Sequence, residues 1–134
     1  MATPALRILL VEDHLSTNTA LTKTLRLTGH TVYPAADGKV ALKLMEENRD
    51  GFDLLISDIR LPDVNGWDLL RKLRAHQPNL RAIALTGHGF PDDIKRSNEA
   101  GFNLHLTKPM DWMSIEKAIA SLFLPAPPRS ASSP

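Results

Sequence analysis

The stretch Phe52-Asp53-Leu54-Leu55-Ile56-Ser57-Asp58 is a short apolar run that stops at a carboxylate. A run of this length, bounded by polar residues, is typical of a strand that is buried on both faces. The same pattern predicts three further strands: residues 6–11 before Glu12, residues 80–85 before Thr86, and residues 102–107 before Lys108. Each of these four strands therefore ends at a charged or hydroxyl side chain.

Segments with helical periodicity alternate with these strands. A weaker strand is expected over residues 31–35, where Pro34 suits an edge position. The expected helices are residues 16–27, a helix capped by Asp37 with Val40, Ala41 and Leu44 on one face, a helix with Trp67, Leu70 and Leu73 inward, residues 91–100, and residues 111–123. Five strands alternating with five helices imply an α/β fold, an open doubly wound (βα)5 sandwich with right-handed crossovers.

Composition sets further limits on the chain. Its 134 residues fit one domain over residues 1–124, followed by a Pro- and Ser-rich segment, 125–134, that reads as a disordered tail or the start of a linker. The absence of cysteine excludes disulfides and thiolate metal sites. A net charge of +1 indicates no direct contact with nucleic acid or membrane. With no signal pattern and no long apolar run, a cytoplasmic location is expected.

The residues that end the strands predict where the chemistry lies. In a doubly wound sheet, ligands bind beyond the carboxyl ends of the strands, where the strand order reverses. This rule brings Glu12, Asp13, Asp58, Thr86 and Lys108 to one edge of the sheet. Clustered carboxylates repel one another unless a cation is bound, and Mg²⁺ prefers oxygen ligands. We therefore expect a Mg²⁺ or Mn²⁺ site here.

Each residue of this edge has an expected role. Asp13 and Asp58 are the expected direct metal ligands, with the backbone carbonyl of Ile59 as a third and Glu12 acting through water. Asp58 is also the expected nucleophile toward phosphorus, as carboxylates are in aspartyl-phosphate chemistry. Lys108 supplies positive charge to the phosphoryl oxygens and Thr86 supplies a hydroxyl donor.

Four motifs in these positions resemble those of the receiver domains of two-component response regulators. They are residues 9–13 (LLVED), 57–66 (SDIRLPDVNG), 85–87 (LTG) and 106–109 (LTKP), and the resemblance extends to Leu124. It implies a flavodoxin-like sheet of strand order 2-1-3-4-5, with a cis bond before Pro109. It also implies that Asp58 accepts a phosphoryl group from a phosphohistidine of a histidine kinase or histidine phosphotransfer domain.

The resemblance further implies a conformational switch, in which Thr86 moves toward the phosphoryl group. Such domains usually have Tyr or Phe three residues before the lysine, whereas this chain has His105. We therefore hypothesise that His105 replaces the aromatic switch and couples the output to pH, because its charge changes near neutrality. The polar helix 91–100, strand five and helix five form the expected output face. Arg60 and Gly87 occupy positions that tune phosphoryl lifetime in similar domains.

Other classes of protein with a similar sheet fit the sequence less well. A haloacid-dehalogenase-like phosphatase needs a second Asp two residues after its nucleophile, where this chain has Arg60. A flavodoxin-type flavin site needs a phosphate-binding loop where Glu12 and Asp13 lie. Nothing in the sequence supports a pseudo-receiver that keeps the fold but takes no phosphoryl group, because every chemical residue is present. The expected protein is a phosphoacceptor rather than an enzyme, with self-dephosphorylation at most. It is either a single-domain response regulator or the last receiver of a hybrid histidine kinase.

Overall fold

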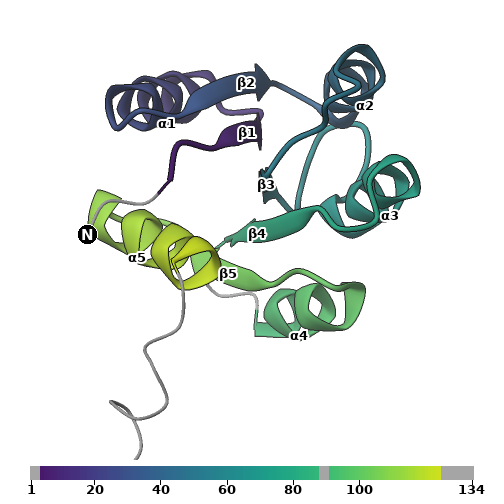
Figure 1. Cartoon of the computed structure of the whole chain (residues 1–134). Coiled ribbons are helices and arrows are strands. Elements are labelled where there is room, and N and C mark those ends of the chain that lie inside the picture. The colour runs from purple at the N-terminus through teal and green to yellow at the C-terminus, as the bar shows by residue number, and fades with distance from the viewer. Residues whose placement is uncertain (1–3, 88–90, 125–134) are drawn as a thin grey trace, which may run out of the picture.

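The computed structural model describes residues 4–87 and 91–124, and it contains ten secondary-structure elements in alternating order (Figure 1). They are β1 (Arg7–Val11), α1 (Leu15–Leu27), β2 (Thr31–Ala35), α2 (Gly38–Glu47), β3 (Leu54–Asp58), α3 (Gly66–His76), β4 (Arg81–Thr86), α4 (Pro91–Ala100), β5 (Leu104–Thr107) and α5 (Trp112–Phe123). The expected tail 125–134 and the loop residues 88–90 lie outside the described residues. Among the described helices, none has the length and apolar character that a membrane span requires.

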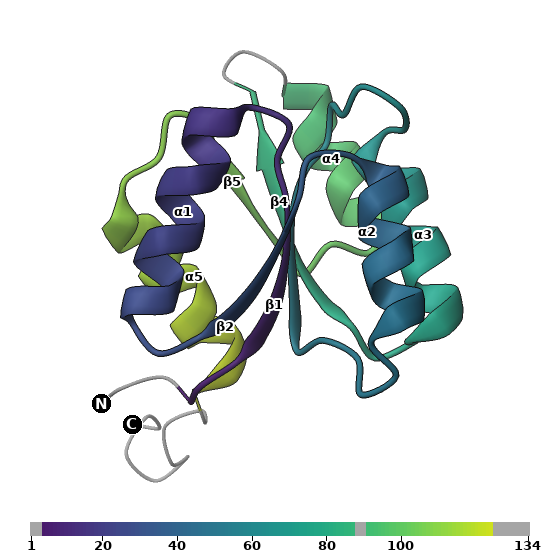
Figure 2. The same cartoon turned by 90° about the horizontal axis from the view of Figure 1, so that it is seen from above.

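The five strands form one parallel sheet in the order β2-β1-β3-β4-β5, which confirms the expected fold class. Figure 2 shows the sheet between two layers, with α1 and α5 on one side and α2, α3 and α4 on the other. The strand order reverses between β1 and β3. In this pair Val11 lies opposite Ser57, so the residues that follow them, Glu12 and Asp58, are neighbours.

Alternating side chains of the central strands supply the two hydrophobic cores. In β1, Leu9 and Val11 pack with α2 and α3, whereas Ile8 and Leu10 pack with α1 and α5. All four side chains are fully buried. Because successive side chains of a strand point to opposite faces, a strand buried on both faces needs a nearly continuous apolar run. This requirement explains why the short runs in the sequence predicted the strands.

The structure corrects several details of the sequence prediction. β3 begins at Leu54 rather than residue 52, and β5 begins at Leu104 rather than residue 102. Phe52 and Phe102 are buried, but in the turns that precede these strands. Val40 is exposed rather than on the inner face of α2, because the inward positions are those of Ala41 and Met45. A buried side chain at a strand entrance gives the same apolar signal as the strand itself.

The loop between β3 and α3 holds the end of β3 against its neighbours. Asn65 caps α3 by accepting a hydrogen bond from the Asp68 N–H, and the Asp63 carboxylate accepts from the N–H groups of Gly38 and Lys39 at the start of α2. The Gly66 N–H donates to the Ile59 carbonyl at 2.7 Å. These hydrogen bonds fix the backbone that directly follows Asp58.

Gly66 lies too close to this backbone to carry a side chain. A Cβ at Gly66 would lie 2.6 Å from the Asp58 carbonyl oxygen and 2.9 Å from Ile59 Cα. We therefore expect Gly66→Ala to lower the free energy of unfolding by about 3 kcal/mol, because backbone must shift to relieve the clash. Denaturant unfolding measures this change.

Gly29→Ala is the matched control for Gly66→Ala. Gly29 has a φ of +101°, but a Cβ there would meet no atom within 4 Å. Only the backbone conformation is strained in this variant, at a cost of about 1 kcal/mol. Equal losses in the two variants would show that the close approach at Gly66 has no energetic weight.

Candidate functional site

Three carboxylates gather at the carboxyl ends of β1 and β3. Glu12 and Asp13 follow β1 and Asp58 ends β3, and each offers one carboxylate oxygen such that all three oxygens lie within 4.8 Å of one another. Glu12 is 1% exposed and Asp58 is 4% exposed, whereas Asp13 is exposed. The arrangement expected from the fold rule is therefore present, with Asp13 at the solvent side. Oxygen ligands at this spacing suit a hard divalent cation.

The Lys108 ammonium lies between two of these carboxylates. Its Nζ is 2.6 Å from Asp58 Oδ1 and 2.6 Å from Glu12 Oε1. The Lys108 N–H donates to the Thr86 carbonyl at 2.8 Å, which ties this backbone to the end of β4, and the following bond to Pro109 is cis, as expected. A residue distant in sequence thus compensates part of the negative charge of Glu12 and Asp58.

The pKa values of the two buried carboxyls are shifted in opposite directions. Burial, together with the neighbouring Glu12 carboxylate, raises the pKa of Asp58 to about 8 despite the opposing effect of Lys108. Burial also acts to raise the pKa of Glu12, but hydrogen bonds with Asp58 and Lys108 and from the His14 N–H outweigh it, and the pKa is lowered. Without a cation, Asp58 therefore holds a proton at neutral pH. A divalent cation bound to these carboxylates would favour the ionised form of Asp58.

Two other predicted residues have different partners in the structure. Thr86 is 1% exposed, and its hydroxyl donates to the Leu106 carbonyl of β5 at 3.3 Å rather than to a carboxylate. The Ile59 carbonyl accepts the hydrogen bond from Gly66, so one of its two lone pairs is already used. The structure thus brings together the three carboxylates and the ammonium but turns the Thr86 hydroxyl toward the neighbouring strand.

The remaining predicted residues surround the carboxylates. The Arg60 guanidinium contacts the Asp93 carboxylate of α4, with Nε and Nη2 each 3.2 Å from an oxygen. Gly87 is half-buried and directly follows β4. His105 is half-buried in β5, opposite Ala84 in the register, so both residues lie on the sheet face that α2, α3 and α4 cover. Thr86, two residues after Ala84, lies on the same face.

Sequence reasoning missed Asn18, a polar residue on the inner side of α1. Its amide donates to the Glu12 carbonyl at 2.9 Å and to the Ala35 carbonyl at 3.2 Å, and its Oδ1 accepts from the Thr22 hydroxyl. Asn18 is buried and ties α1 to the backbone of Glu12. The only available signal was a polar residue at a position where the helical period expects an apolar one.

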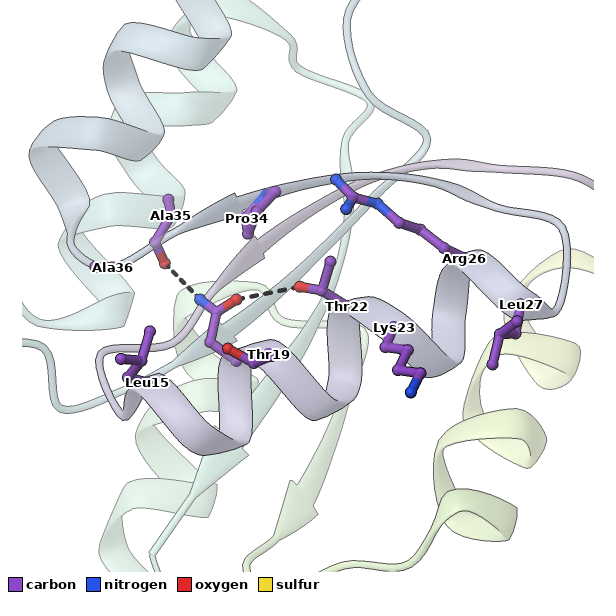
Figure 3. A pocket seen from close by; sticks show the side chains of 10 residues that line it. Leu15, Thr19, Thr22, Lys23, Arg26, Leu27, Pro34, Ala35 and Ala36 are labelled. Atoms are coloured by element: carbon purple, nitrogen blue, oxygen red, sulfur yellow. Dashed lines mark hydrogen bonds between the residues drawn. The ribbon is translucent and has the colours of Figure 1, made fainter.

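Asn18 and Thr22 also line a groove of about 670 Å³ between α1 and β2, which Figure 3 shows from close by. The site carboxylates are not among its lining residues. Arg26 crosses this groove and donates from Nη2 to the Val32 carbonyl at 2.8 Å. Next along β2, Pro34 has no N–H to donate. At the outer edge of β2, one carbonyl is therefore bonded by a side chain of the protein itself and one N–H is absent.

Comparison with known proteins places this site in a family. Residues 8–120 match the family of the response regulator receiver domain. The chain belongs to this family. The receiver domain is 30% identical to sporulation initiation phosphotransferase F of Bacillus subtilis (strain 168) over 113 residues, which cover 84% of this chain and 90% of that protein. It is 34% identical to the sensor protein EvgS of Escherichia coli (strain K12) over 117 residues, which cover 87% of this chain but 10% of that protein.

Solved structures agree with this assignment. A response regulator receiver domain protein from Clostridium thermocellum superposes with a TM-score of 0.80 at 28% identity, covering 88% of this chain and 93% of that one. The receiver domain of the hybrid histidine kinase CckA superposes with a TM-score of 0.72 at 32% identity, covering 86% and 96%. The receiver domain is thus a signalling domain of two-component systems.

The raised pKa of Asp58 leads to an expected proton release when a cation binds. Near pH 7 most of the metal-free receiver domain holds a proton on Asp58, because the pKa is about 8. Titration with Mg²⁺ should release close to one proton per cation near pH 7 and almost none above about pH 9. Calorimetry in buffers of different ionisation enthalpy measures this number. Release that does not vary with pH would contradict the assignment of the proton to Asp58.

The same pKa sets the pH dependence of stability without metal. The folded state keeps the Asp58 proton up to about pH 8, whereas the unfolded chain loses it near the ordinary value of 3.8. Because the folded state binds more protons in this window, its stability falls relative to that of Asp58→Asn as the pH rises through it. Thermal unfolding of both proteins in a chelator, at several pH values, measures the difference.

Proposed function

We propose that this receiver domain accepts a phosphoryl group on Asp58 from a phosphohistidine of a histidine kinase or histidine phosphotransfer domain. In this step the phosphorus–nitrogen bond of the donor breaks and a bond forms between phosphorus and an Asp58 oxygen, and the histidine keeps the electron pair of the broken bond. The observation that carries the proposal is the ammonium of Lys108, 2.6 Å from the Asp58 carboxylate at the end of β3. Family membership supports the same reading.

A divalent cation, Mg²⁺ or Mn²⁺, belongs to this proposal. Asp13 and Asp58 are the proposed direct ligands, Glu12 is proposed to act through water, and the Ile59 carbonyl would contribute the lone pair that Gly66 does not use. When bound, such a cation supplies positive charge to the transferring phosphoryl oxygens and keeps Asp58 ionised. The exposed position of Asp13 leaves one side of the cluster open to solvent.

The protein's own residues do the remaining work. Glu12 holds the Lys108 ammonium beside Asp58, where it would contact the oxygens of an arriving phosphoryl group. Transfer of this kind needs positioning and charge neutralisation more than covalent chemistry. Thr86 would release the Leu106 carbonyl and turn its hydroxyl toward the phosphoryl oxygens.

The output of the domain is proposed to be the surface of α4, β5 and α5. His105 and Thr86 lie on the same face of the sheet, next to α4. A movement of Thr86 would therefore change the packing around His105 and α4. His105 is proposed to take the role of the aromatic switch residue three positions before Lys108. Arg60 and Gly87 lie at the edge of the site and are proposed to tune the phosphoryl lifetime.

The wider context follows from the relatives. The chain resembles nearly the whole of one relative and a small part of EvgS, which is a sensor protein. We propose that it acts in the cytoplasm, either as a single-domain response regulator or as a receiver of a hybrid histidine kinase. In either case it would be a phosphoacceptor, with no catalysis beyond loss of its own phosphoryl group.

Treatment with acetyl phosphate and Mg²⁺ tests the proposal. Intact-mass spectrometry should detect one added phosphoryl group on the wild-type protein and none on Asp58→Asn. Asp50→Asn changes an exposed carboxylate in the loop before β3, at the opposite end of this strand from Asp58, and should be modified like the wild type. Removing the metal with a chelator should lower the modification rate at least tenfold, because the charge of the cluster is then uncompensated. Equal modification of Asp58→Asn and wild type would overturn the assignment of Asp58.

A further inference from the structure

The buried side of α4 is polar. Asp93 and Ser97 are the buried residues among those of α4 whose side chains are described, whereas Ile94 and Ala100 are only half-buried. A helix with so little buried apolar surface gains little from the hydrophobic effect. Its attachment to the domain therefore depends on the partners of these two polar residues.

These partners come from the segment that directly follows Asp58. The Arg60 guanidinium holds the Asp93 carboxylate through two nitrogens, each at 3.2 Å. Farther along the helix, the Trp67 indole N–H donates to the Ser97 hydroxyl at 3.0 Å, and the Arg96 guanidinium lies 3.9 Å from the centre of the Trp67 ring. The first turn of α4 is thus held by Arg60 and its middle by Trp67.

The Arg60–Asp93 pair is asymmetric in burial. The side chain of Arg60 is 63% exposed, whereas that of Asp93 is 6% exposed. The Arg60 guanidinium is therefore the solvent-facing partner of the pair, whereas the Asp93 carboxylate lies buried on the helix. If Arg60 left, Asp93 would lose this partner while it stayed buried, which is unfavourable for an ionised group.

Arg60 is also two residues from Asp58, which places their Cα atoms at most about 7 Å apart. A phosphoryl group on Asp58 would bring new negative oxygens to this position, and guanidinium groups bind phosphoryl oxygens in pairs. Two anions then compete for one guanidinium.

We propose that the Arg60–Asp93 pair is a latch that couples α4 to phosphorylation, an inference that rests on the proposed function. Asp93 holds the Arg60 guanidinium while Asp58 is free, and the phosphoryl oxygens take it when Asp58 is modified. The first turn of α4 is then released, while Trp67 and Ser97 hold the middle of the helix as a pivot. This route is independent of Thr86 and His105.

A double-mutant cycle distinguishes a latch from a static ion pair. Arg60→Met, Asp93→Asn and the double variant are unfolded in denaturant, with and without the phosphoryl mimic beryllium fluoride plus Mg²⁺. Without the mimic, the two positions should be coupled by about fivefold in the unfolding equilibrium constant. With the mimic bound, the coupling should disappear. Coupling of equal size in both states would overturn the latch.

Hydrogen exchange of residues 91–100 provides a second measurement. In the wild type, the mimic should raise the exchange rate of the amides of residues 95–97, which bond the carbonyls of the first turn of α4, about tenfold. In Arg60→Met these amides should exchange fast without the mimic and show no further change. Arg71→Met removes the same charge from an exposed α3 residue paired with Asp68, and it should behave like the wild type. A response of equal size in wild type and Arg60→Met would overturn the proposal.

The two proposals fail in different ways. Phosphorylation of Asp58 is followed separately by intact mass after treatment with acetyl phosphate. A wild-type protein that is phosphorylated but shows no change in α4 would overturn the latch and leave the phosphoacceptor role intact. A protein that is never phosphorylated would overturn both.

Discussion

The ammonium of Lys108, held between the carboxylates of Glu12 and Asp58, is the interaction on which the site depends. It joins the ends of three strands, β1, β3 and β5, across a charge cluster that would otherwise repel itself. One positive charge does not balance three carboxylates, and burial together with the Glu12 carboxylate raises the pKa of Asp58 to about 8. The sheet thus brings the three carboxylates and the ammonium together at one edge.

Much of this arrangement follows from the sequence because the fold imposes it. Short apolar runs predict buried parallel strands, and the carboxyl ends of such strands must meet at one edge, so Glu12, Asp13, Asp58 and Lys108 were predicted together. Side-chain direction at the end of a strand does not follow from this rule. Thr86 is in the predicted place, yet its hydroxyl bonds to β5, a choice between rotamers that no periodicity encodes.

The polar contacts of α4 were beyond prediction for a different reason. In the sequence, Asp93 lies at the start of a helix, where an acid is more commonly a favourable charge near the helix N-terminus. Its burial depends on Arg60, a residue thirty-three positions earlier. Long-range polar pairs leave no periodic trace in a sequence, since either partner alone is typical of a solvated surface. Such pairs give α4 a specific position with little apolar burial.

The outer edge of β2 has a consequence for how this domain coexists with others. An open strand edge invites pairing with strands of neighbouring molecules. Here the Arg26 side chain occupies the Val32 carbonyl, and Pro34 offers no donor, so a foreign strand would find few free groups to bond. At the β2 edge of the sheet, strands of further domains or of other copies would therefore find fewer partners for pairing.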